Sequence, residues 1–468
     1  MDPRYDVLED AARLARAFVD GLDARPAGAT ASVDELRARL ARPLTDAGED
    51  PRTVITDLAA DAEPGLTASA GPRYFGFVTG GALPAAVAAD WLTSAWDQNG
   101  GGAVTTPALA VVEAVAAGWV RELLGLPPAC GVGFVTGCQM AHVTCLAAAR
   151  HAVLAGAGWD VEADGLQGAP ALRIVAGAHA HVTIARACRI LGLGAARIRV
   201  VPADGAGRMI AGELGAALQE HDGPQIVCAQ AGEVNSGAFD PLAQIVATCR
   251  EHGAWCHVDG AFGLWAAVSP SRRVLLDGFR DADSWATDGH KWLNVPYDCG
   301  IAIVADPTTQ RGAMASSADY IPSNDGDVPW GVESTPEFSR RVRGVPLYAA
   351  LRTLGRDGVA DLVDRCCDHA QRIAARLAED DGVEILNDVV LNQVLVRFGA
   401  GDDVTNAVID RVQADGTCWA GGSRWHDKAV MRISVSGWQT TSADADRSAD
   451  AILAALRAVT GGGGPATA

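Results

Sequence analysis

The segment Trp255-Cys-His-Val-Asp-Gly-Ala-Phe262 begins as an apolar run and ends in Asp259 and a turn of small residues. The next apolar run, residues 283–287, leads in the same way into Asp288-Gly-His-Lys-Trp292, which contains Lys291. In a parallel sheet the carboxyl ends of the strands lie along one edge, and ligands bind there. The two segments therefore predict that Asp259 and Lys291 lie close together at one edge of a sheet.

The chain around these segments alternates between two kinds of pattern. Ala- and Leu-rich stretches long enough to be helices, such as 141–155 and 241–252, separate short apolar runs. Strands that alternate with helices predict an α/β fold whose mainly parallel sheet is covered on both faces. Besides the run 283–287, the predicted strands are 133–135, 173–176, 197–201, 225–229, 255–258 and 301–304.

The pattern changes after about Arg343. Long helical stretches, 346–354 and 361–377, come before further strands, and a last helix covers about 442–459. This order predicts a smaller α+β domain. Its predicted strands are 383–386, 390–398 and 430–435.

The N-terminal part of the chain predicts helices. Residues 1–22 repeat apolar residues at helical spacing, and Ser32 with Glu35 forms a capping box at the start of a second helix. Residues 46–72 show no clear pattern. We therefore expect four parts in the chain: a helical segment 1–70, a large domain 71–342, a small domain 343–460 and a disordered tail 461–468.

Composition narrows the class of protein. The 468 residues are 49% hydrophobic and carry a formal net charge of −19, which disfavours nucleic acid and anionic membrane as partners. The first 22 residues are rich in Asp and Glu, unlike a secretory signal, so we expect a cytoplasmic protein. The 11 cysteines are scattered without zinc-ligand spacing, and we expect no structural metal.

A third motif, Gly133-Phe-Val-Thr-Gly-Cys-Gln-Met-Ala141, is a strand and a small-residue turn that opens a helix. Each motif alone has a plain structural explanation, such as a turn cap for Asp259 or a surface loop for Lys291. Together they suit pyridoxal 5′-phosphate. Lys291 can form a Schiff base, Asp259 can keep the pyridine nitrogen protonated by raising its pKa about 1–3 units, and the helix that opens near Cys138 can bind the phosphate.

These motifs resemble a known family. His257-Val-Asp-Gly-Ala261 followed by His290-Lys-Trp-Leu-Asn-Val-Pro-Tyr-Asp-Cys-Gly300 is similar to the group II pyridoxal-phosphate-dependent amino-acid decarboxylases, which have the aspartate-aminotransferase fold, or fold type I. The resemblance extends from about Tyr74 to Thr441. It implies a seven-stranded type of sheet, decarboxylation of an L-amino acid through a Lys291 aldimine and a quinonoid, and a homodimer with its active site at the interface.

The resemblance also implies roles for residues around the cofactor. His181 matches the histidine that stacks on the pyridine ring, with His179 as the alternative if the alignment shifts. The remaining cofactor contacts implied are Gly137, Cys138 and Gln139 in the phosphate turn, Ala261 against the ring, and His290 beside Lys291.

Other segments match the family's substrate side. Phe77 and Thr79, within Tyr74-Phe-Gly-Phe-Val-Thr79, match residues that line the substrate pocket, as does Thr105-Thr-Pro-Ala108. In the loop that begins at Glu233, either Glu233 or Asn235 is expected near the phenolic oxygen of the cofactor.

The sequence departs from the family in the loop 316–340. Group II decarboxylases have a tyrosine there that protonates the carbanion, but the matching position falls near Trp330-Gly331. Tyr320 is the candidate substitute proton donor or substrate contact, followed by His181. Transamination, with Arg432 binding the α-carboxylate, remains an alternative, as do aldol-type cleavage, oxidative deamination and a non-catalytic binding protein.

Overall fold

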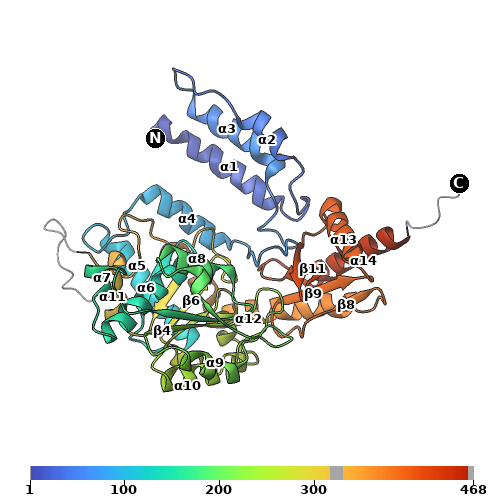
Figure 1. Ribbon diagram of the computed structural model, residues 1–468. Helices are drawn as coiled ribbons and strands as arrows, with labels where there is room; N and C mark the ends of the chain where they lie inside the picture. The colour runs from blue at the N-terminus through green and yellow to red at the C-terminus, as the bar shows by residue number, and fades with distance from the viewer. Residues whose placement is uncertain (1, 317–329, 462–468) are drawn as a thin grey trace.

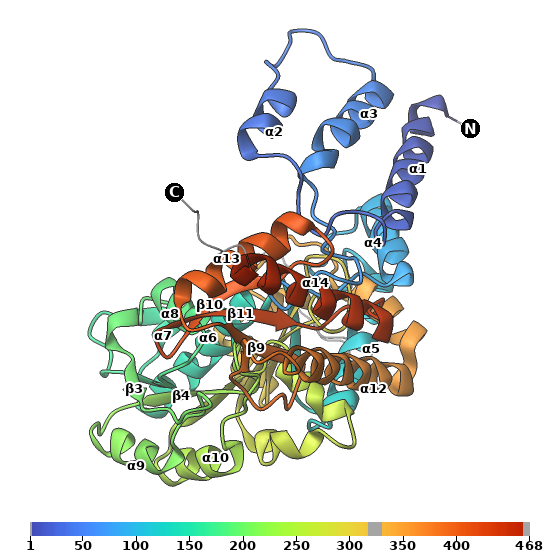
Figure 2. The ribbon, with the colours of Figure 1, turned by 90° about the vertical axis from the view of Figure 1, so that its right-hand side faces the viewer.

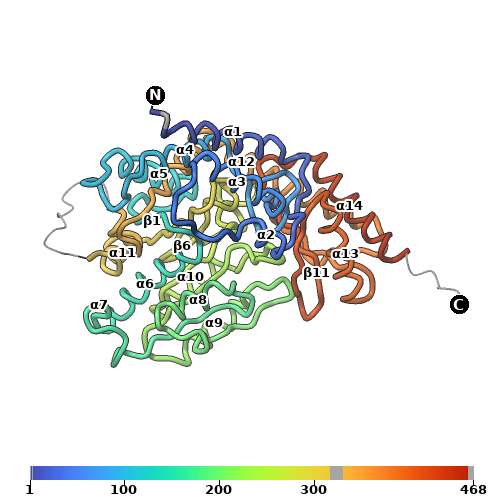
Figure 3. Tube along the Cα trace, turned by 90° about the horizontal axis from the view of Figure 1, so that it is seen from above, coloured from blue at the N-terminus to red at the C-terminus, as the bar shows by residue number. Residues whose placement is uncertain are grey.

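The computed structural model describes residues 2–316 and 330–461. A large sheet lies in the middle of the molecule with helices on both faces. A smaller sheet lies at one end, far from α7 (Val161–Asp164) and α11 (Pro307–Met314) (Figures 1 and 3). No helix in these two ranges is both long enough and apolar enough to cross a membrane.

The large sheet has seven strands in the order β1-β7-β6-β5-β4-β2-β3. Strands β2 to β6 pair in parallel, whereas β7 is antiparallel to both of its neighbours, β1 and β6. The predicted α/β class with a mainly parallel sheet is therefore confirmed. The strands are β1 (Gly131–Val135), β2 (Arg173–Gly177), β3 (Arg199–Val201), β4 (Gln225–Gln230), β5 (Trp255–Asp259), β6 (Ser284–Asp288) and β7 (Gly300–Val304).

The central strands are buried on both faces. Every residue of β4, β6 and β7 is buried, as continuous apolar runs in a covered sheet predict. One face packs against α6 (Cys138–Gly156), α8 (Val182–Ile190) and α11. The opposite face packs against α5 (Pro107–Leu124), α9 (Ala211–Gln219), α10 (Leu242–Glu251) and the first half of α12 (Gly344–Leu377).

The small sheet has four antiparallel strands in the order β10-β11-β9-β8. They are β8 (Val383–Ile385), β9 (Gln393–Phe398), β10 (Gly421–Trp425) and β11 (Lys428–Ser434). Figure 2 shows α13 (Asp402–Asp415) and α14 (Ser442–Gly461) beside this sheet. The two helical stretches predicted before it are the halves of α12, which Gly355 separates with φ 64° and ψ −177°.

Three helices at the N-terminus stand apart from the main body, above α4 (Pro84–Trp96) (Figures 1 and 2). The predicted amphipathic helix is α1 (Asp6–Asp20), and α2 (Val33–Leu40) has the predicted capping box. None of the residues of α1, α2 and α3 (Pro51–Ala62) is fully buried. Their apolar surface therefore has no complete partner within the described part of this chain.

The sequence prediction missed several elements. Helix α3 was not predicted, although Asp50 accepts a hydrogen bond from Thr53 N–H at 3.0 Å and Pro51 occupies the first turn. Strand β10 was not predicted because Gly421-Gly-Ser-Arg-Trp425 lacks apolar alternation. Strand β9 starts at Gln393 rather than Val390. Helix α14 ends at Gly461, the first residue of the predicted disordered tail, and residues 462–468 of that tail lie outside the described residues. Short 3₁₀ helices cover Pro3–Tyr5, Glu63–Gly65, Ala195–Arg197, Gly263–Val268, Arg273–Leu276, Phe279–Asp281 and Gly331–Glu333.

Candidate active site

The candidate site lies at the carboxyl ends of β4, β5 and β6. Asp259 pairs with Gln230 on one side and Ala286 on the other, so the three strands end at nearly the same level. Asp288 is the last residue of β6, and Lys291 follows it in the next turn. The two sequence segments therefore lie at the same edge of the sheet, as predicted.

Lys291 forms an ion pair at the bottom of the site. Its Nζ lies 3.0 Å from Oδ2 of the buried Asp288. Burial lowers the pKa of Lys291, but the charges of Asp288 and Asp259 outweigh burial and raise that pKa to about 12. Lys291 therefore carries a positive charge in this arrangement.

The loop that contains Phe77 and Thr79 lies directly against Lys291. A Cβ atom at Gly80 would lie 1.8 Å from the carbonyl oxygen of Lys291, so only glycine permits this approach. Phe77, with φ 54°, is 65% exposed, and its ring centroid is 5.5 Å from that of Trp419. The side chain of Thr79 is buried.

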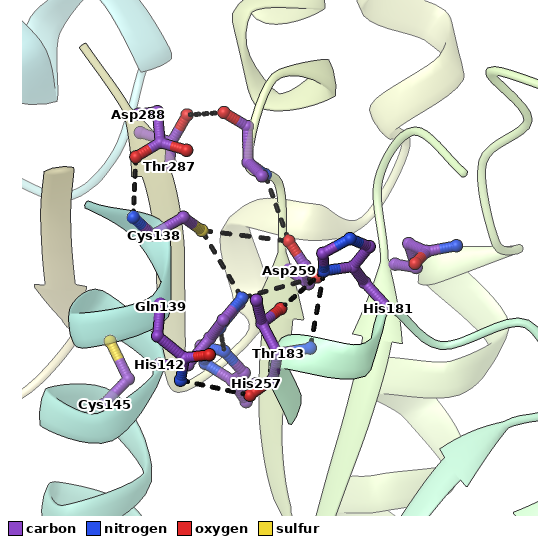
Figure 4. A network of polar contacts seen from close by, with 12 residues as sticks. Cys138, Gln139, His142, Cys145, His181, Thr183, His257, Asp259, Thr287 and Asp288 are labelled. Carbon is purple, nitrogen blue, oxygen red and sulfur yellow. Dashed lines mark hydrogen bonds and ion pairs between the residues drawn. The ribbon is translucent and has the colours of Figure 1, made fainter. Parts of the chain in front are cut away.

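Asp259 is buried and polar groups surround its carboxylate (Figure 4). Oδ1 accepts a hydrogen bond from the backbone N–H of Ala261 at 3.1 Å, and Oδ2 lies 3.4 Å from Nε2 of His142. Burial raises the pKa of Asp259, but His142, His181 and Lys291 together lower it well below its usual value. Asp259 is therefore ionised and available to a cationic partner.

The turn before α6 binds an anion. The backbone N–H of Cys138, the first residue of the helix, donates to Oδ1 of Asp288 at 2.6 Å. Free N–H groups and the positive end of the helix dipole favour such an anion. A Cβ atom at Gly137 would lie 3.1 Å from Cε1 of His290, so the turn is tight against the residue before Lys291. Gln139 points elsewhere, because its Nε2 donates to the carbonyl oxygen of Thr183 at 3.3 Å.

The two candidate histidines occupy different places. Nδ1 of His181 accepts the N–H of Thr183 at 3.4 Å, so the proton of the neutral ring lies on Nε2. Burial lowers the pKa of His181, the charge of Asp259 raises it, and the charge of Lys291 lowers it further. Figure 4 shows His181 beside Asp259. His179 instead packs against Trp425 of the small domain, with ring centroids 4.9 Å apart and the ring planes tilted by 46°. The structure therefore places His181, and not His179, beside Asp259.

His290 and Ala261 complete the wall of the site. Nδ1 of His290 accepts the N–H of Cys299 at 3.1 Å, and its ring lies 4.3 Å from that of Tyr297. Ala261 is half-buried, and its carbonyl oxygen accepts the N–H of Asp288 at 3.0 Å. Ala261 thus fixes the end of β5 to the end of β6.

Arg432 enters the site from the small domain. It lies on β11 and is half-buried, and across residues 2–316 and 330–461 its side chain makes no hydrogen bond and no ion pair. Burial lowers the pKa of Arg432, and the charge of Glu233 partly restores it. The Glu233 carboxylate accepts hydrogen bonds within its own loop from Asn235 N and Ser236 N, at 2.7 and 2.6 Å. The side-chain oxygen of Asn235 accepts the hydroxyl of Ser423 at 2.7 Å.

The loop expected to supply a proton donor is described only at its ends. Tyr320 lies outside the described residues. Trp330 is buried, and a Cβ atom at Gly102 would meet its ring at 2.7 Å. Farther along, Nη1 of Arg340 lies 3.0 Å from Oε1 of Glu113 in a buried ion pair. Trp330 therefore takes part in packing at this point.

Sequence reasoning missed four polar residues of this region, namely His142, His257, Ser284 and Asp288. The signals were present. His142 lies four residues after Cys138 and so on the same face of α6, and His257 lies two residues before Asp259 and so on the same face of β5.

Comparisons with known proteins agree with this geometry. The family described as "Pyridoxal-dependent decarboxylase conserved domain" matches residues 34–399. Tryptophan decarboxylase 1 of Oryza sativa subsp. japonica is 28% identical over 433 residues, covering 86% of this chain and 83% of that protein. The acidic amino acid decarboxylase of Bos taurus is 28% identical over 361 residues, covering 75% of this chain and 68% of the relative.

A solved structure shares the fold. The crystal structure of Oryza sativa TDC with PLP and tryptamine superposes with a TM-score of 0.90 at 24% identity, covering 97% of this chain and 98% of the other. The predicted fold type is thereby confirmed.

Proposed function

The chain belongs to the pyridoxal-dependent decarboxylase family, and on that premise we propose that it converts an aromatic L-amino acid into its amine and carbon dioxide. The cofactor of this family is pyridoxal phosphate. The observation that carries the proposal is the meeting of Lys291, Asp259 and the turn at Cys138 at one edge of the large sheet.

The residues present fit pyridoxal phosphate. Lys291 supplies an amine, and Asp259 supplies an ionised carboxylate for a protonated ring nitrogen. The amino end of α6 supplies an anion site, at which the N–H of Cys138 donates to the Asp288 carboxylate in this structure. When bound, pyridoxal phosphate accepts the electron pair that departing carbon dioxide leaves on the α-carbon. The other contacts we propose are Gly137, the backbone of Gln139, His181, Ala261 and His290.

Asp288 and His181 handle protons in this proposal. An amine must lose a proton before it can act as a nucleophile, and Oδ2 of Asp288, 3.0 Å from Lys291 Nζ, can take that proton. His181, whose Nδ1 is an acceptor, offers its Nε2–H to the substrate side of the site.

Arg432 is our candidate for binding the substrate carboxylate, because it is a half-buried cation without a partner in the described chain. Replacing Arg432 with methionine should lower kcat/KM by about 10²-fold, since a hydrogen bond to a charged group contributes about 1.5–3 kcal/mol. The loss should appear mainly in KM, and Arg432→Lys should recover part of it. Steady-state kinetics will measure both.

The matched control is Arg424→Met, which removes an exposed arginine from the neighbouring strand β10. Its kcat/KM should stay within a few-fold of the wild type. Equal losses in the two variants would contradict the role of Arg432.

The exposed aromatic side chains favour an aromatic substrate over an acidic one. Phe77, three residues before Gly80, is 65% exposed, and Tyr297, whose ring lies 4.3 Å from that of His290, is 63% exposed. Aromatic rings pair favourably with such faces by about 0.5–1.5 kcal/mol beyond the area they bury. An acidic substrate is the second candidate, in which case Arg432 would bind its side-chain carboxylate instead of the α-carboxylate.

Product analysis tests the proposed reaction. Purified enzyme with pyridoxal phosphate should release carbon dioxide and the amine from tryptophan, tyrosine or phenylalanine, and more slowly from glutamate or aspartate. Mass spectrometry of the products separates the alternatives. An aldehyde with hydrogen peroxide would indicate oxidative deamination, and transfer of the amino group to a 2-oxo acid would indicate transamination. Either result would overturn the proposal.

We also propose a homodimer. The helices α1 and α3 leave apolar side chains exposed, among them Leu8 at 59% and Leu58 at 54%, and α4 leaves Trp91 and Trp96 exposed at 46% each. A patch of this kind on a protein surface marks an interaction site.

Replacing both Leu8 and Leu58 with glutamate should weaken the dimer by at least about 10²-fold, since each buried leucine contributes about 1.5–3 kcal/mol. Light scattering across a dilution series will show the change, and activity should fall with the dimer. Leu44→Glu is the control, because Leu44 is fully exposed in a loop. A wild-type chain that is monomeric and fully active would rule the dimer out.

The cysteines support the cytoplasm as the compartment that we propose. All 11 are free and buried, and none forms a disulfide. Proteins of oxidising compartments use such residues as disulfides far more often.

A further inference from the structure

A line of buried polar side chains runs from Asp259 into the protein core. Nε2 of His142 lies 3.4 Å from Oδ2 of Asp259, and Nδ1 of His142 lies 3.0 Å from Nε2 of His257. Nδ1 of His257 in turn lies 2.9 Å from Oγ of Ser284. The side chains of His142, His257 and Ser284 are fully buried, and Figure 4 shows His142 and His257 on one side of Asp259.

One arrangement of protons satisfies the whole line with both rings neutral. The Asp259 carboxylate only accepts, so His142 must donate to it from Nε2 and accept at Nδ1. His257 must then donate from Nε2 and accept the hydroxyl of Ser284 at Nδ1. The lone pair of that hydroxyl accepts the indole N–H of Trp255, a donor only, at 2.9 Å. Burial lowers the pKa of His257 to about 3, which agrees with a neutral ring.

We propose that His142, held in one tautomer by His257 and Ser284, is a positioning residue that keeps the Asp259 carboxylate ionised and fixed in orientation for the cofactor's ring nitrogen. The inference rests on the proposed role of Asp259. It goes beyond that role because it assigns the ionisation of Asp259 to three residues behind the site. Of these, His142 touches the site itself, at Asp259 and at Sγ of Cys138, which lies 3.4 Å from its Nε2.

The surroundings of Asp259 make this support necessary. Burial alone raises its pKa, and the largest opposing effect is that of His142, whose Nε2 lies 3.4 Å from Oδ2. The thiol of Cys138 adds little, because its Sγ lies 3.9 Å from Oδ1 and burial raises its pKa well above the usual value. The other titratable groups that act near Asp259 are His181 before α8, Lys291 after β6, Asp288 at the end of β6, and Asp240 and Cys228 on the side of β4.

The protonation state of the cofactor's ring nitrogen tests whether His142, His257 and Ser284 keep Asp259 ionised. Holoenzyme reconstituted with ¹⁵N-labelled pyridoxal phosphate should show a protonated ring nitrogen by NMR from pH 6 to 9. In His142→Met the donor is lost, Asp259 takes up a proton within this range, and the ring nitrogen should lose its own. His142→Gln, which retains an N–H near the position of Nε2, should restore the wild-type profile in large part.

Kinetics should follow the same order. We expect kcat to fall about 10-fold in His142→Met with KM changed less than twofold, comparable to the loss of an outer hydrogen-bond partner at a metal site. His257→Phe and Ser284→Ala leave His142 in place but free its tautomer, so they should shift the ¹⁵N profile in the same direction by less. These two variants also decide the matter if His142→Met does not fold.

The control is His369→Gln, which changes a buried histidine of α12 in the small domain. It should leave the ¹⁵N profile unchanged. If Asp259→Asn alters the profile and none of the three line variants does, this inference is wrong and the role of Asp259 stands. If Asp259→Asn also leaves the nitrogen protonated, the proposed role of Asp259 fails with it.

Discussion

Replacing Lys291 with alanine should lower kcat by at least about 10³-fold, because the substitution removes the amine that forms the covalent bond to the cofactor. The protein should still fold, since the Lys291 side chain contributes one ion pair, with Asp288. Borohydride treatment of the wild type should fix the cofactor to the chain. The same treatment of Lys291→Ala should not.

The small number of lysines in the chain makes the site of the reduced adduct easy to assign. The sequence contains two lysines, Lys291 and Lys428. Lys428 is exposed at the start of β11, so Lys428→Ala is the matched control and should keep the wild-type rate. Peptide mapping therefore has only two side chains to distinguish. A reduced adduct on Lys428 in the wild type would refute the assignment.

Replacing Asp259 with asparagine should lower kcat by about 10²–10³-fold, because an ionised group next to developing charge contributes that much in a buried site. The variant should retain some cofactor, since the contacts of Lys291 and Cys138 are unchanged. Asp240→Asn is the control, because it removes a buried carboxylate that accepts backbone N–H groups of Met209 and Gln230 instead. Activity of Asp259→Asn within a few-fold of the wild type would exclude the proposed role.

The pH dependence of Asp259 has a definite sign. Its folded pKa lies below the unfolded value of about 3.9, so its contribution to stability is present above about pH 4 and is lost as pH falls further. Above pH 5 the rate should therefore show no titration of Asp259. Acid unfolding of Asp259→Asn, followed by circular dichroism, should lose this part of the slope.

The large domain was predictable because its signals are local. The apolar runs at β4, β5 and β7 are short, uninterrupted and bounded by polar residues, and the structure forms strands at each. The edge strand β3 was placed two residues early, because Arg197 ends a 3₁₀ helix and not a strand. In the small domain β10 was missed, since its two glycines and Ser423 have no strand pattern and only the pairing with β11 holds it.

The site was predictable where one residue type implies its chemistry. A strand-end aspartate and a lysine after the next strand could be recognised in sequence, and the structure brings them together. The role of Asp288 could not be recognised in the sequence. Its contacts with Lys291 and with the N–H of Cys138 exist only because the end of β6 lies beside the turn before α6. Arg432 lies 251 residues after His181 in the chain. The two side chains come close only because the small domain packs against the large one.

The burial of all 11 cysteines has a practical consequence. A thiol can react with a reagent in solution only when the structure around it opens, so the native protein should consume almost none of a colourimetric disulfide reagent. Cys366 and Cys367 on α12, Cys418 before β10 and Cys256 on β5 sample both domains. Their labelling rates, measured for each peptide, would report how often each part of the chain opens. They would show whether the two sheets open together or one before the other.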